Sequence, residues 1–280
     1  MTLPPLSAET LFHIGNFPVT NTYVNSTLTV IGFAIVGWII SRKTNTSKLR
    51  APTGIVNFAE RILEILLGYF DGVTRSRAKS IQFLPIVGTL FLFILISNWI
   101  GLLPGIGSIG IHAVHEGHIE LIPLFRSANT DLNLTLAMSV TVIVLSHVLG
   151  IAVIGFFKYA NKFIKLGDIW QAVKTGKPMN IIISFVEFIV GLLEVFSEIA
   201  KMVSLSLRLF GNVFAGEVLM TVLASLIAFI VPLPFMALEL LVGIVQATVF
   251  SMLTLVYLTI AITPVHGHGE EHGQQAAHTA

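Results

Sequence analysis

The feature that most constrains this chain is a mostly apolar run, Ile181 to Val231, that has an arginine inside it. The arginine, Arg208, belongs to the stretch SLSLRLFGNVFAGE, which also supplies Asn212 and Glu217. A guanidinium at membrane depth costs roughly 2.5–3.5 kcal/mol on insertion scales, and arginine does not give up its proton in proteins. A chain that keeps such a group uses its charge, so we interpret Arg208 as the fixed cation of an ion path.

The composition places the chain in the membrane. Of its 280 residues, 54% are hydrophobic and 11% are charged, whereas soluble domains carry about 25% charged residues. The absence of cysteine excludes disulfides, iron–sulfur clusters and thiolate metal sites. We find no phosphate-binding loop or dinucleotide fingerprint and a net charge of only +1. We therefore expect no cofactor and no nucleic-acid partner, and we expect the chain itself not to bind ATP.

We predict an all-α integral membrane protein with a single membrane domain. Three apolar stretches have the length of a membrane span, at 23–41, 81–103 and 132–157. Residues 52–79 alternate apolar positions at helical spacing with charges, which predicts an amphipathic helix on the membrane surface rather than an ordinary soluble packing helix. The run around Arg208 would be roughly 75 Å long as one helix. It is therefore either two spans broken near Arg208 or one steeply tilted helix, since the hydrocarbon core is only ~30 Å thick.

The remaining segments are predicted to lie outside the membrane. Residues 1–22 contain three prolines and are expected to be irregular or a short surface helix, and residues 105–130 to be a loop. The His-rich tail, 265–280, is expected to be disordered. Most of the 16 Lys and Arg residues lie in 42–79 and 158–177, so that side is predicted to be cytoplasmic, with the N-terminus outside. Five crossings would then place the C-terminus inside.

Two groups of acidic residues flank Arg208. Glu187, Glu194 and Glu198 share one helical stripe, with Lys201 close to it. The stripe is either an ion-paired seam, in which Lys201 neutralises Glu198, or a wet acidic path from the cytoplasm; we favour the path for Glu194. Glu217 lies nine residues past Arg208, on the opposite side of a straight helix. It is a candidate for a second path from the other membrane side, or else a buried protonated carboxyl.

Other polar residues lie in the remaining apolar segments. In the last run, 235–263, Glu239 and Gln246 are seven residues apart and share a face. If this run packs back on the Arg208 helix, Gln246 could hold the guanidinium and Glu239 could lie near Glu217. Three more polar groups at membrane depth or at its edge are Asn98, Asp131, which is predicted to cap the third span, and His147, which is either a structural histidine or a proton carrier.

Histidines also gather in the predicted loop. His112, His115 and His118 have a spacing that could bind Zn²⁺ or Cu²⁺. A solvated polar loop is the favoured interpretation, so no metal site is predicted.

Two acidic paths with a fixed cation between them indicate a mechanism. Protons that enter one path cannot pass Arg208 and must be carried around it. No side chain of this chain can move from one path to the other, so the carrier would be a carboxylate on a partner protein. Arg208 would favour the ionised form of that carboxylate as it passes.

Several motifs resemble subunit a of rotary ATP synthases. The longest is SLSLRLFGN, Ser204 to Asn212, continued by AGE ending at Glu217. QATVFSMLTLVYL from Gln246, DLNLTLAM from Asp131, and Asn98 ahead of LLP also match in order and spacing. The resemblance implies a steeply tilted helical hairpin, 180–263, against a ring of c subunits, and hence about five membrane-crossing helices in a multi-pass protein of the bacterial inner membrane.

The resemblance also implies roles and partners. Arg208 would separate two aqueous half-channels. The periplasmic half-channel would be lined by Glu217, Glu239, Asn212, Gln246 and Asn98, while Glu194 would belong to the cytoplasmic one; we add Asp131 as a proton-path candidate. The partners would be the c-ring subunits with their carrier carboxylates, peripheral-stalk b subunits, the lipid bilayer and, indirectly, the catalytic head that makes ATP.

Two other function classes compete. A secondary transporter could use Arg208 as the counter-charge of an anionic substrate, but such folds often have two matched halves, and we find no second copy of SLSLRLFGN. A purely structural membrane subunit would not need Arg208 to be charged. The sequence does not distinguish H⁺ from Na⁺ as the coupled ion.

Overall fold

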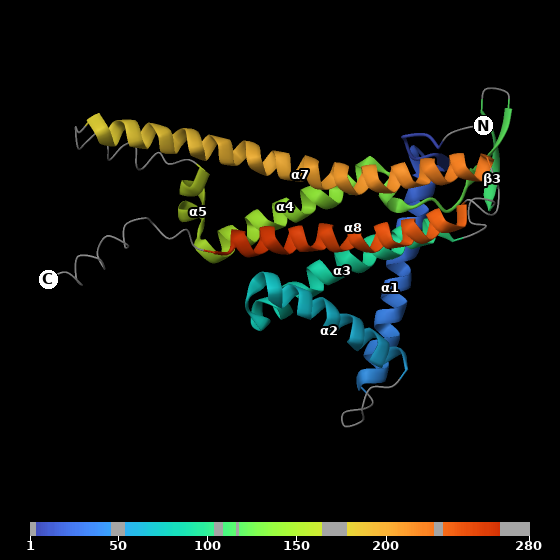
Figure 1. The fold of residues 1–280 in the computed structure, drawn as a ribbon, viewed down its shortest axis with the longest axis horizontal. Coiled ribbons are helices and arrows are strands. Elements are labelled where there is room, and N and C mark those ends of the chain that lie inside the picture. The colour runs from blue at the N-terminus through green and yellow to red at the C-terminus, as the bar shows by residue number, and fades with distance from the viewer. Residues whose placement is uncertain are drawn as a thin grey trace. The chain divides into compact units, whose positions relative to one another are not determined.

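The computed structural model describes residues 4–45, 54–103, 109–115, 118–163, 178–226 and 232–263. Within these ranges the chain forms seven α-helices, a short 3-10 turn and two β-hairpins. Four of the helices are long and apolar enough to cross a membrane: α1 (Asn21–Asn45), α3 (Arg77–Leu102), α4 (Leu132–Ile154) and α8 (Pro232–Ala261). The prediction of a helical, multi-pass membrane protein is therefore confirmed (Figure 1).

The helix that carries Arg208 is continuous. It is α7, Pro178–Leu226, with 49 residues, and Figure 1 shows it without interruption. The alternative of two spans broken near Arg208 is therefore wrong. The physical reason lies in the composition of the run: after Pro178 it contains no proline, and its isolated glycines cost only about 1 kcal/mol each relative to alanine.

The chain folds into two compact units. One contains Met1–Val142 and Ile199–Val256, and the other contains Ile143–Glu198 and Tyr257–Ala280. The first unit holds α1, α3, the part of α7 around Arg208 and most of α8. The second holds the C-terminal part of α4, the short helix α5 (Phe156–Phe163) and the first part of α7.

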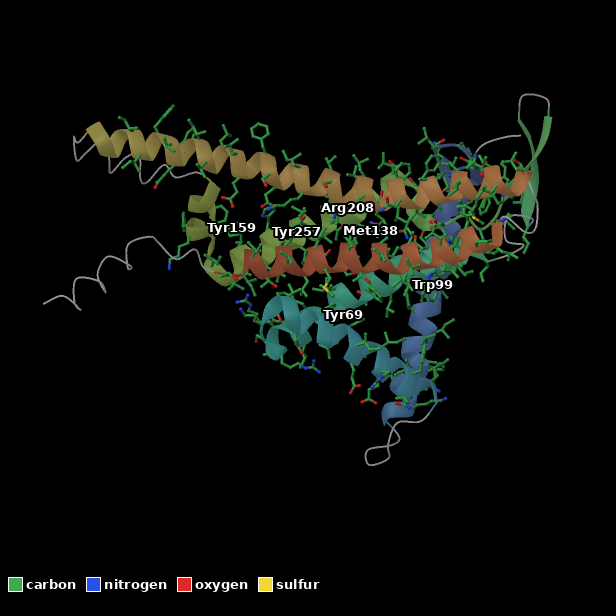
Figure 2. The ribbon with its side chains drawn as sticks, viewed as in Figure 1. Tyr69, Trp99, Met138, Tyr159, Arg208 and Tyr257 are labelled. Carbon is green, nitrogen blue, oxygen red and sulfur yellow. The ribbon has the colours of Figure 1, made fainter. Side chains whose placement is uncertain are left out.

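In the first unit, α2 (Ile55–Thr74) packs on α3 through one apolar stripe and exposes a second one. Its buried residues are Leu66, Leu67, Phe70 and Thr74. Phe58 and Ile65 are exposed, and so is Tyr69, which is labelled in Figure 2. Exposed apolar side chains are expected of a helix on a membrane surface. The helix ends at Arg75, whose φ of 52° is left-handed. The Thr74 and Ser80 hydroxyls, 2.7 Å apart, join the two helices across this turn.

The N-terminal segment is a β-hairpin. β1 (Thr10–Ile14) pairs antiparallel with β2 (Phe17–Thr20). The two turn residues are Gly15, at φ +62°, and Asn16. The prediction of an irregular segment or a surface helix, which rested on the three prolines of residues 1–22, is wrong. A Gly-Asn pair between two short runs rich in aromatic and β-branched residues is a hairpin signal.

A second hairpin replaces part of the loop predicted at 105–130. β3 (Gly110–His115) pairs antiparallel with β4 (His118–Pro123), with His115 opposite His118. The side chains of His112, His115 and His118 lie outside the described residues, and so does the predicted disordered tail. The 3-10 turn η2 (Ala128–Thr130) then leads into α4.

The second unit contains a sharp turn between two helices. The third span was expected to run to residue 157, but α4 ends at Ile154 and α5 begins at Phe156. Gly155 lies between them at φ +94°, a conformation that glycine adopts readily and other residues do not. The turn brings Tyr159 against Gly150: a Cβ on this glycine would overlap the tyrosine ring.

Candidate functional site

Arg208 belongs to α7 (Figure 2), and its side chain is exposed. Leu205, Ser206 and Leu209 on the same helix are buried, while Leu207 is 49% exposed. Within the described ranges the guanidinium makes no hydrogen bond and no ion pair. Gln246 does not hold it, because the Gln246 side-chain oxygen accepts a hydrogen bond of 2.7 Å from the Asn212 amide. Arg208 is therefore an exposed cation between two leucines, Leu207 and Leu209.

Polar side chains join the helices near Arg208. Gln246 is 3% exposed, and its bond to Asn212 links α8 to α7. Ser206 and Thr135, both fully buried, have hydroxyls 3.2 Å apart and link α7 to α4. On α7, Asn212 contacts Gln246 of α8, and Gly216, one turn later, contacts Glu239, which precedes Gln246 in α8. Residue numbers thus rise along α7 as they fall along α8, so the helices are antiparallel here.

Glu217 has a buried counter-charge. The Arg126 Nε donates to the two Glu217 carboxylate oxygens over 2.9 and 3.1 Å, and Nη2 donates to one of them over 3.0 Å. The Arg126 side chain is 2% exposed and that of Glu217 28%. Arg126 also donates to the backbone carbonyls of Ser7 and Pro5. Three hydrogen bonds to one carboxylate and two to backbone carbonyls of the N-terminal segment hold this guanidinium in one orientation.

Arg126 is the functional candidate that sequence reasoning missed. Its only signal was its isolation, as the single basic residue in the segment predicted to lie outside the membrane between the second and third spans. Nothing in the sequence pairs it with Glu217, which is 91 residues away.

Glu239 lies against α7 beside Glu217. A Cβ on Gly216 would overlap the Glu239 carboxylate, so the carboxylate occupies the space that the glycine leaves open. The structure therefore brings Glu239 to the residue next to Glu217, as the shared face with Gln246 predicted. It also places Arg126, Glu217 and Glu239 in one unit of the chain.

Two further predicted site residues belong to this unit: Asn98 lies on α3, and Asp131 directly precedes α4. Asn129 donates to the Asn98 side-chain oxygen over 2.7 Å, and both residues are buried. Asp131 accepts from the Asn133 backbone N–H over 2.9 Å, which confirms it as the cap of α4. Its second oxygen accepts from the Thr22 hydroxyl over 3.2 Å. Asp131 therefore serves to position α1 and α4, whatever else it does.

A separate polar cluster lies in the second unit. His147 Nδ1 is 2.7 Å from the Tyr159 hydroxyl, and Nε2 is 4.0 Å from the Glu198 carboxylate. Glu194 is half-buried one turn before Glu198. Burial raises the pKa of the Tyr159 phenol, and the Glu198 and Glu194 carboxylates raise it further. The predicted acidic stripe thus meets a histidine and a tyrosine.

The model of the ATP synthase A chain family matches residues 24–259. The chain belongs to the ATP synthase subunit a family. A subunit a from Moorella thermoacetica is 31% identical over 258 residues, which are 92% of this chain and 96% of that protein. One from Campylobacter jejuni subsp. jejuni is 30% identical over 235 residues, 84% and 88% of the two chains. A subunit a 2 from Bradyrhizobium is 28% identical over 261 residues, 93% and 97%.

Membership of the subunit a family settles the broad role. The family provides a membrane-sector subunit of the proton-transporting ATPase complex, and this subunit does not itself catalyse ATP synthesis. The resemblance seen in the SLSLRLFGN motif is confirmed.

Gly216 provides a test of the Glu239 position. We expect Gly216→Ala to reduce proton-driven ATP synthesis about tenfold, or about 1.4 kcal/mol of activation free energy, because the new methyl group displaces the Glu239 carboxylate. The amount of assembled complex should stay constant, since the end of a flexible side chain is the part that must move. Gly37→Ala in α1 is the matched control, with nothing within 4 Å of the added carbon. Equal synthesis rates in the two variants would contradict the assigned position.

Proposed function

We propose that this chain is the stator subunit of the membrane sector of a rotary ATP synthase. It provides two aqueous half-channels for protons, separated by Arg208, and couples proton flow to rotation of a c ring and to ATP synthesis in a separate catalytic head. The observation that carries the proposal is the position of Arg208: it is exposed on α7 and has no partner among the described residues, while its neighbours Leu205 and Leu209 are buried. A cation presented in this way is available to a carboxylate on another protein.

The periplasmic half-channel, called the outer half-channel from here on, is assigned to the polar groups on the Glu217 side of Arg208; the cytoplasmic one is called the inner half-channel. It comprises Glu217, Glu239, Asn212, Gln246 and Asn98, with Asp131 at its edge. The Asn98 Nδ2 and Gln246 Nε2 atoms are buried and have no hydrogen-bond partner in the part of the chain that the structure describes. Buried polar groups are rarely left unsatisfied, so these amides can bind water along a path. Glu194 is assigned to the inner half-channel.

The orientation follows from length and charge. A helix of 49 residues is about 74 Å long, so α7 crosses a ~30 Å core only at a steep tilt. It is the fourth of five crossings, after α1, α3 and α4 and before α8. The Lys and Arg distribution places 42–79 and 158–177 in the cytoplasm of a bacterial cell, with the N-terminus outside and the C-terminus inside. The peripheral-stalk b subunits and lipid contact the remaining exposed faces.

Cysteine cross-linking tests the ring contact directly, because the chain has no cysteine of its own. We expect Leu207→Cys, at a 49% exposed position beside Arg208, to form a disulfide with a single cysteine placed near the carrier carboxylate of a c subunit. Leu205→Cys, at a 1% exposed position two residues away, should form none. Cross-linking measured on gels of oxidised membranes gives the answer. An unreactive Leu207→Cys in assembled complexes would contradict the proposed ring face.

A further inference from the structure

The second unit brings together a histidine, a tyrosine and a carboxylate from three helices. His147 comes from α4, Tyr159 from α5 (Figure 2) and Glu198 from α7. The imidazole contacts the phenol through Nδ1 and faces the carboxylate through Nε2. The His147 side chain is 30% exposed and that of Glu198 is 13%. The cluster thus runs from a mostly covered carboxylate to a partly exposed imidazole ring.

The fold holds Tyr159 in place by two glycines. Gly155, at φ +94°, turns the chain back after α4. Gly150 lacks the side chain that would overlap the Tyr159 ring, and it lies one turn after His147 on the same helix. Tyr159 is 6% exposed, so its hydroxyl has a fixed position next to the imidazole. With Nδ1 engaged by this hydroxyl, Nε2 is directed at Glu198.

The two neighbours of His147 have different chemical roles. Burial and the nearby carboxylates keep the Tyr159 phenol protonated, so it orients the ring rather than carrying charge. The distance of 4.0 Å from Nε2 to the Glu198 oxygen is longer than a hydrogen bond. A side-chain rotation or one water molecule closes such a distance. Imidazole is the side chain that exchanges protons most readily near neutral pH.

We propose that His147 is a proton relay of the inner half-channel, which passes protons between Glu198 and the cytoplasmic solvent, and that Tyr159 is its positioning residue. The inference deepens the proposed function and rests on it. In the exit direction, a protonated Glu198 gives its proton to Nε2 of the neutral imidazole, which becomes imidazolium. The imidazolium then releases one proton to solvent, and the Glu198 carboxylate is ready to accept the next.

The test uses membrane vesicles that contain the complete ATP synthase, with proton-driven ATP synthesis as the readout. His147→Gln keeps a side chain that can hydrogen-bond Tyr159 but cannot carry a proton. We expect the rate to fall about tenfold, less than the ~10²–10⁴ contributed by positioned acid–base groups, because water also conducts protons. The quantity of assembled complex should not change. A wild-type rate for His147→Gln would overturn the relay.

Chemical rescue separates a relay from a structural histidine. In His147→Ala, free imidazole added on the side where ATP is made should restore the rate at least threefold, whereas tetramethylammonium at equal ionic strength should not. His13→Ala, in the exposed hairpin strand β1, is the matched control and should show neither the loss nor the rescue. An assembled His147→Ala complex that is slow but insensitive to imidazole would show that His147 is structural and would overturn the proposal.

The positioning role of Tyr159 is tested in the same vesicles. Tyr159→Phe keeps the ring against Gly150 and removes only the hydroxyl. We expect a loss of about threefold with partial rescue by imidazole, a pattern that lost packing would not produce. Unchanged activity in Tyr159→Phe would contradict the orienting hydrogen bond.

An Arg208→Ala vesicle preparation distinguishes failure of the relay from failure of the proposed function. If Arg208→Ala abolishes coupled synthesis but His147→Gln is fully active, the relay is wrong and the stator role stands. If Arg208→Ala still couples proton flow to synthesis, the proposed function itself is wrong, and the relay falls with it.

Discussion

Replacing Arg208 with alanine is expected to abolish proton-driven ATP synthesis while the complex still assembles. The loss should be at least about 100-fold, or about 2.7 kcal/mol of activation free energy. Without the cation, a proton on a ring carboxylate can pass from one half-channel to the other without a full rotation. Moving one charge across 100 mV is worth about 2.3 kcal/mol, so such a leak dissipates the drive. Assembly is preserved because the guanidinium makes no hydrogen bond or ion pair with the other described residues.

The measurement is ATP synthesis in energised vesicles beside passive proton uptake through the membrane sector. Arg61→Ala is a matched control: the same substitution in an exposed helix, where Arg61 and Glu64 are 3.8 Å apart with side chains 75% and 62% exposed. Exposed pairs of this kind contribute little, so both rates should stay normal. Arg208→Lys should retain part of the function, since a lysine preserves the charge but not the planar fork. Coupled synthesis in Arg208→Ala would refute the barrier.

Arg126→Ala is expected to destabilise the protein strongly. Removing the guanidinium leaves the Glu217 carboxylate without the three donor contacts it now has. Breaking a buried ion pair from one side costs about 3–5 kcal/mol. We therefore expect the thermal midpoint of the purified complex to fall by several degrees. Proton-driven synthesis should fall with it, because Glu217 loses the group that orients it.

Two comparisons make this prediction specific. Arg77→Ala removes an ion pair of similar distance, 2.7 Å to Asp71, but with side chains 53% and 35% exposed, and it should leave the midpoint unchanged. The double variant Arg126→Leu with Glu217→Leu should recover much of the stability, because an apolar pair can replace a buried ion pair at little cost. It should not recover proton transport. A midpoint equal to wild type in Arg126→Ala would show that the pair is not buried in the assembled complex.

The sequence alone predicted those features that depend on local composition and residue spacing. Arg208 in an apolar run, the long apolar helices and the cap at Asp131 all follow from local composition and spacing. The structure contains these helices and the cap, although α4 ends at Ile154 and not at residue 157. Glu239 beside Glu217 was also predictable, because residues seven apart share a helical face and the run after Pro232 packs back on α7.

The rest depended on contacts between distant segments. Arg126 finds Glu217 across 91 residues, and His147 meets Tyr159 only because Gly155 turns the chain back. Neither pairing leaves a periodic signal in either segment. The sequence also did not predict that α7 is continuous, because the length of this apolar run fits either two spans or one tilted helix. The N-terminal hairpin was not predicted for a different reason. Its three prolines favour an irregular segment, whereas its Gly-Asn turn favours a hairpin.

The Arg126 contacts also impose an order on how the protein is made. Pro5 and Ser7, whose carbonyls bind this guanidinium, leave the ribosome long before it does. Glu217 follows it by 91 residues, which at ~5–20 residues per second takes about 5–18 s. During that interval the nascent chain already holds two neutral acceptors for the arginine, and its anionic partner arrives last.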